Sequence, residues 1–263
     1  MLERNSSETG RRPALLGGMK RIDLNCDLGE GAAHDAELMP LITSANIACG
    51  AHAGDRATMR STVALAERHG VAIGAHPGYH EPGNFGRLER AVTPDEAAGL
   101  VLTQVQALHE VAGPALRHVK LHGALYNQVS RDEALAAVVV DGLVRHFPKL
   151  VLFALSGSRL AEAGRARGLR VAEEVFADRT YQADGNLTPR SQPQATIQDE
   201  AAAVHQVLRM VADGRVRAVD GRDVAIAADT VCLHGDGAHA VEFARRLRKE
   251  LAVAGVAVRA FGT

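Results

Sequence analysis

Short apolar runs alternate with amphipathic segments along most of the chain. The runs, rich in Val, Ala, Ile and Leu, lie near residues 20–25, 44–48, 71–75, 117–121, 150–154, 171–175 and 230–234. The amphipathic segments between them end at glycines suited to helix C-termini, namely Gly70, Gly113, Gly168, Gly214 and Gly255. Seven strands separated by helices predict an α/β fold with a parallel sheet, most simply a closed (β/α) barrel.

Local signals add detail to this framework. Residues 93–96 (TPDE) and 130–133 (SRDE) both have the pattern of a capping box that opens a helix. Within Val216–Val224, the dipeptide Asp220-Gly221 lies between alternating apolar residues and predicts a hairpin.

The first strand carries an unusual polar stripe. In the run Ile22–Glu30, the side chains of Asp23, Asn25 and Asp27 share one parity, and apolar residues occupy the other. Strands of a parallel barrel are covered on both faces and are almost continuously apolar. Polar groups that face a covered interior are costly unless they are paired or used. The stripe therefore indicates a functional site.

Other reactive side chains follow the remaining strands, where a barrel collects its functional groups. They are Glu30 after the first strand, Asn46, His52 and Asp55 after the second, His76 after the third, His118, Lys120 and His122 along the fourth, and His234 and Asp236 after the seventh. Such groups at one barrel mouth can tune one another's pKa. Single residues also have structural explanations, since Asp55 and Asp236 each have the pattern of a helix N-cap.

Composition narrows the function. The 263 residues, 46% hydrophobic and 23% charged, fit one enzyme-sized domain over 19–263, with 1–18 as a disordered extension and Met19 as an alternative start. A net charge of −1 and 3% aromatic residues argue against nucleic acid and membrane surfaces as partners. The three cysteines, Cys26, Cys49 and Cys232, lack pairing motifs, and no apolar run has the length of a membrane span. We expect a cytoplasmic protein.

Cofactor motifs are scarce. His52 is followed four residues later by Arg56, so the chain lacks a helical His-x-x-x-His pair there, and we expect no bound transition metal. There is also no G-x-x-x-x-G-K-[ST] loop for nucleotide phosphates.

Seven motifs together resemble the LamB/YcsF family, and the resemblance runs from Met19 to the C-terminus. The motifs are Asp23–Glu30, Asn46–Asp55, Gly74–Tyr79, His118–Lys120, His122–Asn127, Glu174–Arg179 and His234–Asp236. Two positions differ, because the family usually has Pro at Leu121 and Arg at Leu88. By strand parity Leu121 should face away from the site, whereas Leu88 replaces a potential substrate or partner contact.

The resemblance implies a seven-stranded barrel like that of glycoside hydrolases and deacetylases. It also implies one component of an ATP-dependent 5-oxoprolinase with three kinds of subunit, a cyclic amide hydrolase that opens 5-oxoproline to L-glutamate. Its cofactor would be ATP with Mg²⁺, bound in or shared with one of the two partner subunits.

The strand-end positions and the resemblance together give a set of expected site residues. The catalytic ones are Asp27, His76, Lys120, His122 and His234. The substrate-binding ones are Asp23, Asn25, Glu30, Asn46, His52, Asp55, Arg87, Tyr126, Asp178, Arg179 and Asp236. Asp27 or His76 would be the general base, Lys120 would stabilise the oxyanion or phosphoryl charge, His122 and His234 would protonate the leaving nitrogen, and Arg87 or Arg179 would hold the substrate carboxylate.

Two other functions stay open. One is a metal-dependent deacetylase of a small N-acyl or sugar substrate, which the scarcity of aromatic residues disfavours. The other is a non-catalytic subunit that binds substrate or docks partners, which a buried Lys with several His disfavours. Because an unpaired buried ammonium is costly, we also expect removal of Lys120 to leave the fold intact.

Overall fold

The computed structural model describes residues 20–234, 237 and 239–262. The predicted disordered extension (1–18), Met19 and Asp236 lie outside these residues. No helix in the described part is long and apolar enough to cross a membrane.

Seven parallel strands form a closed ring, as the sequence predicted. They are β1 (Arg21–Leu28), β2 (Ser44–Ala48), β3 (Ala72–His76), β4 (Leu116–Lys120), β5 (Val151–Leu155), β6 (Arg170–Phe176) and β9 (Thr230–Leu233). Each strand pairs with the next in this order, and β1 pairs with both β2 and β9, which closes the barrel. Strand β1 runs on to Leu28 rather than ending near residue 25, so Asp27 still lies within the ladder.

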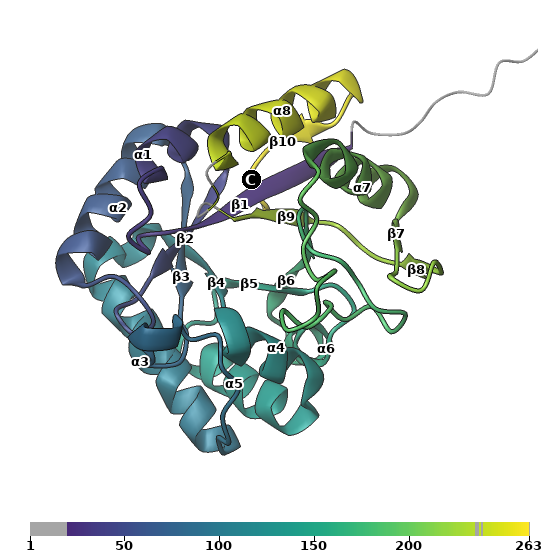
Figure 1. The fold of residues 1–263 in the computed structure, drawn as a ribbon. Helices are drawn as coiled ribbons and strands as arrows, with labels where there is room; N and C mark the ends of the chain where they lie inside the picture. The colour runs from purple at the N-terminus through teal and green to yellow at the C-terminus, as the bar shows by residue number, and fades with distance from the viewer. Residues whose placement is uncertain (1–19, 235–236, 238, 263) are drawn as a thin grey trace, which may run out of the picture.

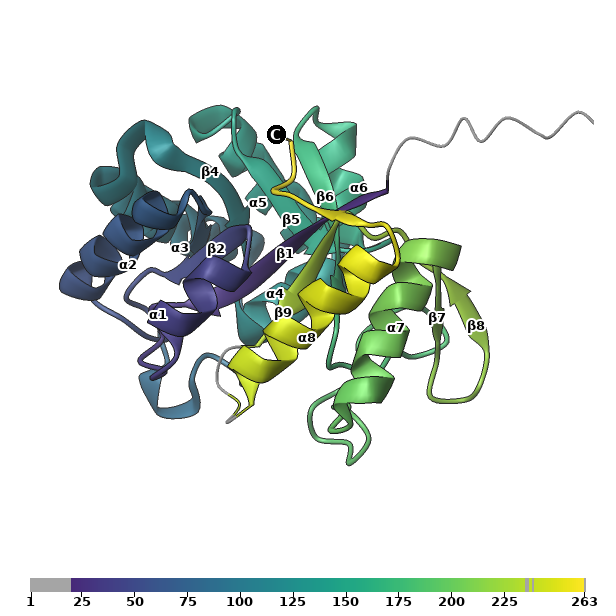
Figure 2. The same ribbon diagram turned by 90° about the horizontal axis from the view of Figure 1, so that it is seen from above.

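Helices cover the outside of the ring (Figures 1 and 2). They are α1 (Asp35–Leu38), α2 (Arg56–His69), α3 (Pro94–Ala112), α4 (Gly123–Arg131), α5 (Glu133–His146), α6 (Arg159–Ala166), α7 (Glu200–Asp213) and α8 (Ala240–Val253), with short 3₁₀ turns η1 (Met39–Leu41), η2 (Pro82–Asn84) and η3 (Gly113–Ala115). The capping box at 93–96 is confirmed. The one predicted at 130–133 is wrong, because α4 continues to Arg131 and Asp132 alone caps α5.

Two short additions complete the sheet structure. The predicted hairpin is confirmed as β7 (Arg215–Arg217) and β8 (Asp223–Ala225), with Gly221 at φ 86° in its turn, and it projects beside α7 outside the ring (Figure 1). Strand β10 (Ala257–Val258), near the C-terminus, lies parallel to the first residues of β1.

The barrel interior is polar along β1, as its stripe predicted. At one level the carboxylate of Asp23 accepts hydrogen bonds from the hydroxyls of Thr43, Ser44 and Thr230. The alternate residues of β1, such as Leu24, are also buried and belong to the main hydrophobic core. Strand alternation therefore separates an apolar packing face from a polar interior.

Gly74 on β3 has no side chain, and this leaves room for the ring of His118 on β4. The imidazole of His118 stacks on Phe153 with ring centroids 4.2 Å apart, and its Nε2 lies 2.8 Å from Asn46 Oδ1. A Cβ atom on Gly74 would stand 2.0 Å from His118 Nε2. Burial and the nearby Lys120 lower the pKa of His118 to about 3, so the ring is neutral and donates its Nε2 proton to the amide oxygen.

We predict that Gly74→Ala destabilises the protein by about 3 kcal/mol, because the added methyl group overlaps the imidazole in a closely packed interior. The matched control is Gly99→Ala on the exposed face of α3, where a Cβ meets nothing within 4 Å. That control should be neutral or stabilising by about 0.5–1 kcal/mol. Urea unfolding of both variants measures the difference, and equal stabilities would contradict the steric argument.

Candidate active site

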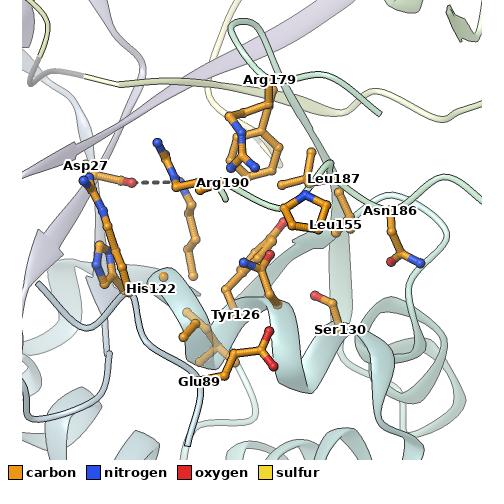
Figure 3. A pocket seen from close by; sticks show the side chains of 18 of the residues that line it. Asp27, Glu89, His122, Tyr126, Ser130, Leu155, Arg179, Asn186, Leu187 and Arg190 are labelled. Carbon is orange, nitrogen blue, oxygen red and sulfur yellow. Dashed lines mark hydrogen bonds and ion pairs between the residues drawn. The ribbon is translucent and has the colours of Figure 1, made fainter. Parts of the chain in front are cut away.

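A cavity of about 470 Å³ opens at the ends of the barrel strands, and its wall includes Asp27, Lys120 and His122. Figure 3 shows Asp27 and His122 on one side of this cavity with Arg190 next to Asp27, and Arg179 and Leu187 farther across it. Parallel barrels place their functional groups at this end.

The buried ammonium of Lys120 is the centre of the site. Its Nζ lies 2.7 Å from Asp27 Oδ1, 3.1 Å from Glu174 Oε1 and 3.0 Å from Cys232 Sγ. Burial alone would lower the pKa of Lys120, but Asp27, Cys232 and Glu174 together outweigh it, so the pKa lies well above the ordinary value. Burial would likewise raise the pKa of Asp27, yet His76 and Lys120 hold it well below its usual range. Lys120 and Asp27 therefore form a charged pair.

Neutral amides and hydroxyls complete the network under this pair. Asn25 donates from Nδ2 to Glu174 Oε1 and to Thr230, while its Oδ1 accepts from Asn46 Nδ2 and Lys120 Nζ. The hydroxyl of Tyr126 donates to Glu174 Oε2 at 2.7 Å. With every polar atom of Asn25 bonded, the network has one arrangement, and this fixes the position of the ammonium.

Three histidines and one carboxylate form a second cluster next to Asp27. Glu30 Oε1 lies 2.9 Å from His52 Nε2, 3.7 Å from His76 Nε2 and 3.5 Å from His122 Nδ1. The rings of His52 and His122 are stacked with centroids 3.7 Å apart, and His76 Nε2 is 3.3 Å from Asp27 Oδ2. The two clusters therefore meet at Asp27.

The backbone fixes which ring nitrogens of His76 and His122 carry protons. His76 Nδ1 faces the carbonyl oxygen of Lys120 and His122 Nε2 faces that of Phe85, each at 2.9 Å. Carbonyl oxygens only accept, so both outer nitrogens are N–H donors. The inner nitrogens, His76 Nε2 and His122 Nδ1, lie 2.9 Å apart, and each carries a lone pair. Two lone pairs at this distance need a cation between them.

A proton can supply that cation. Burial alone would lower the pKa of His76, but Asp27 raises it above the ordinary value. Burial, together with His76 and His52, lowers the pKa of His122 well below the ordinary value. In the absence of other cations, the shared proton therefore belongs to His76.

An Asp–His pair borders the same centre, since a ring nitrogen of His234 lies within 4.8 Å of an Asp27 carboxylate oxygen and of Cys232 Sγ. His234 Nδ1 lies 2.8 Å from Asp178 Oδ2, and His234 Nε2 lies 3.2 Å from a guanidinium nitrogen of Arg190. A guanidinium cannot accept, so Nε2 carries the lone pair and Nδ1 donates to Asp178. This arrangement orients the ring through the carboxylate and places Nε2, which accepts from Arg190, at the cavity wall.

The two expected carboxylate-binding arginines differ in their environment. Arg179 is buried and donates to the backbone carbonyls of Ala195 and Thr188. Burial, with Arg190 nearby, lowers the pKa of Arg179 to about 10. Arg87 is exposed at the cavity wall, with its guanidinium 5.0 Å from the centre of the Phe85 ring. Arg179 thus organises the loop, and Arg87 faces the ligand space.

The structure brings most of the expected residues together around the two clusters and the cavity wall. Asp55 is not brought into the site, because it is exposed and caps α2 by accepting from the Thr58 backbone. Asp23 lies below the site, and among the described residues its buried carboxylate accepts from the hydroxyls of Thr43, Ser44 and Thr230. The prediction that Leu121 faces away is wrong. It lines the cavity, because β4 ends at Lys120 and strand parity no longer applies.

Sequence reasoning missed three members of the site: Glu174, Cys232 and Arg190. Glu174 is fully buried within β6, and a polar residue on a covered strand is the same signal that drew attention to β1. Cys232 shares the inward face of β9 with Thr230, and parity could have found it. Arg190 lies in the loop between β6 and α7, where no periodicity indicates which side chain turns inward.

The buried carboxyl of Asp23 makes stability depend on pH. Burial raises the pKa of Asp23 from 3.8 to about 6, against the hydrogen bonds from Thr230, Thr43 and Ser44. The folded state therefore holds this proton more tightly than the unfolded chain, and stability is lost as the pH rises from about 4 to 6. We predict that the unfolding free energy of Asp23→Asn minus that of wild type rises by about 3 kcal/mol from pH 4 to pH 8.

Urea unfolding at both pH values measures this difference, with exposed Asp95→Asn in the first turn of α3 as the matched control. A difference between Asp23→Asn and wild type that is the same at pH 4 and pH 8 would show that the carboxyl titrates normally.

The sequence-based expectation that Lys120 could be removed without loss of stability assumed that the ammonium is unpaired. That premise is wrong, since the ammonium is paired with Asp27 and Glu174. Removing the cation leaves two buried carboxylates without their partner. We therefore predict that Lys120→Met lowers the unfolding free energy by about 3–5 kcal/mol. The control Lys249→Met, on the exposed face of α8, should change it by about 0.5 kcal/mol or less. Matching stabilities of the two variants in urea unfolding would rule out the ion pairs as a source of stability.

Comparisons with known proteins agree with this geometry. The sequence profile of the LamB/YcsF family matches residues 22–263. A relative from Bacillus licheniformis, named as a 5-oxoprolinase subunit, is 51% identical and covers 93% of this chain and 100% of its own length. One from Geobacillus kaustophilus with the same name is 55% identical, covering 92% and 97%.

Solved structures extend the likeness to the fold. The crystal structure of a lactam utilization protein from Thermus thermophilus superimposes with a TM-score of 0.84 at 44% identity, covering 92% of this chain and all of the other. The profile match and these relatives cover nearly all of the barrel. The chain belongs to the LamB/YcsF family.

Proposed function

We propose that this chain is the component of a cytoplasmic, ATP-dependent 5-oxoprolinase that binds and opens the lactam, together with two other kinds of subunit. The names of its relatives support this function. The observation that carries it is the buried Lys120 held among carboxylates in the wall of a cavity that also presents an oriented His234. This combination suits a reaction that develops negative charge on a carbonyl oxygen and moves protons.

The chemistry needs activation because a five-membered amide is stable to water. In the proposed reaction the lactam oxygen takes the γ-phosphoryl group of ATP, and ADP leaves. Water adds to the activated carbon and loses a proton, the ring C–N bond breaks as the nitrogen gains a proton, and a second water releases phosphate. The sum is 5-oxo-L-proline, ATP and two waters going to L-glutamate, ADP and phosphate.

Roles follow from position. Lys120 lies where it can stabilise charge on the carbonyl or phosphoryl oxygens, and Asp27 keeps it protonated. His234 presents a basic Nε2 to the cavity while Asp178 holds its other nitrogen, so it can take the proton from water and return it to the leaving nitrogen. We assign the substrate carboxylate to Arg87 rather than Arg179, since Arg179 already donates to two backbone carbonyls.

The site for ATP is proposed to lie in a partner or between subunits. The sequence has no Walker-type loop, and the cavity wall of this chain contributes acidic and imidazole groups as well as arginines. An active site that a partner subunit must complete gives no measurable rate alone, because the effects of positioning on rate are large.

A deacetylase stays as the second candidate because of the Glu30, His52, His76 and His122 cluster. The two functions differ in what the isolated chain can do. A deacetylase would release acetate from an N-acetylated sugar without ATP or partners, whereas the proposed 5-oxoprolinase component would not.

We predict that this chain alone shows no 5-oxoproline-dependent release of ADP, and that activity appears when the other two subunits are added. In the reconstituted complex, His234→Gln should lower kcat at least about 100-fold with a smaller change in KM, because it removes the proton carrier. The control His109→Gln, at an exposed position of α3, should leave both constants unchanged.

A coupled assay for ADP, with saturating ATP, Mg²⁺ and 5-oxoproline, measures these rates. Full activity of His234→Gln would remove His234 from the mechanism. Substrate-dependent turnover by the chain alone would disprove the need for partners.

A further inference from the structure

Three acceptors face inward in the cluster of Glu30, His52, His76 and His122. The outer N–H groups of His76 and His122 are held by backbone carbonyls, so their inner lone pairs point toward each other and toward the carboxylate of Glu30. These three acceptor atoms lie within 4.8 Å of one another. A proton bridges two atoms, whereas a metal ion can bridge all three.

The spacing of these atoms matches a four-coordinate metal. The three separations are 2.9 Å between His76 Nε2 and His122 Nδ1, and 3.5 and 3.7 Å from Glu30 Oε1 to the nitrogens of His122 and His76. Metal–ligand distances of about 2.0–2.2 Å place the ligands of a tetrahedral zinc site roughly 3.3 Å apart. The observed values scatter about that length.

The surroundings have the features that support metal ligands. Histidines that bind metals usually donate their other N–H to a backbone carbonyl or carboxylate, as His76 does to Lys120 and His122 to Phe85. His52 is not a ligand, because its ring lies parallel to that of His122 with centroids 3.7 Å apart, and one ion cannot lie in both ring planes. Its Nε2, 2.9 Å from Glu30 Oε1, donates to that carboxylate and orients it.

The charge balance also favours a cation here. Asp27, Glu30 and Glu174 bring three carboxylates to the interior, and Lys120 brings one ammonium. Another candidate ligand group, Asp27, Cys232 and His234, already surrounds Lys120, whose Nζ is 2.7 Å from Asp27 Oδ1 and 3.0 Å from Cys232 Sγ. The ammonium satisfies that group, and of the two described groups the Glu30 cluster is the one left in need of a positive charge.

We propose that Glu30, His76 and His122 bind one divalent transition metal ion of the zinc class, with a fourth position open to the cavity. This is the opposite of the expectation drawn from sequence spacing, which considered only pairs on one helix. The three ligands come instead from the ends of β1, β3 and β4 and the segments that follow them. The inference goes beyond the proposed function and does not rest on it, because metal binding is measured on the isolated chain.

The test is elemental analysis of the untagged full chain, stripped with chelator, reloaded with Zn²⁺ and desalted. We expect about one equivalent of zinc in the wild type. Glu30→Gln keeps the shape of the side chain and removes its charge, and it should lower zinc affinity at least about tenfold, as should His76→Ala and His122→Ala. Cys232→Ser, from the second group, and the exposed His109→Ala are the controls and should retain zinc.

Cobalt(II) provides an independent readout, since tetrahedral Co²⁺ has strong visible absorption that depends on its ligands. We expect this absorption in the wild type and both controls, and its loss in Glu30→Gln. Circular dichroism verifies that each variant is folded, and Glu30→Gln alone decides the question if a histidine variant is not. Less than a tenth of an equivalent of zinc in reloaded wild type, or undiminished binding in Glu30→Gln, would overturn the proposal and leave the shared proton as the bridging cation.

Discussion

A single buried ammonium group organises the interior of this barrel. Lys120 extends from β4 and meets Asp27 of β1, Glu174 of β6 and Cys232 of β9, so its contacts span the ring. Charges inside a protein must be paired and hydrogen-bonded to be tolerated. The strands are therefore held in register by electrostatic requirements at the centre as well as by apolar packing outside, and the reactive groups inherit that rigidity.

The two charged clusters are connected through one carboxylate. Asp27 contacts Lys120 with one oxygen and His76 with the other. A change of charge on either side therefore alters the other, and substitutions in the two clusters should not be additive. Asp178 and His234 form a further pair, and a ring nitrogen of His234 lies within 4.8 Å of an Asp27 carboxylate oxygen. The cavity thus combines a strongly coupled centre with an adjacent proton carrier.

The strands and the polar stripe could be predicted because both depend on local alternation. The spacing of Asp23, Asn25 and Asp27 is enough to identify the interior face of β1, and Glu174 would have done the same for β6. The convergence of side chains from different strands on one site could not be predicted in the same way. Glu30 and His122 are far apart in sequence, and their 3.5 Å contact exists only because the strands close into a ring. The capping role of Asp55, in contrast, followed from its place before a helix.

Closure of the ring also has a consequence for synthesis on the ribosome. Strand β1 is made first, yet one of its two neighbours is β9, and Asn25 donates to Thr230, 205 residues later in the chain. Until that segment emerges, the polar stripe of β1 has no partner on one side and the strand has an open edge. Non-local pairing of this kind forms slowly and exposes edges that can aggregate. The nascent chain therefore carries part of its future site on a strand whose edge stays unpaired until the last strand of the ring is made.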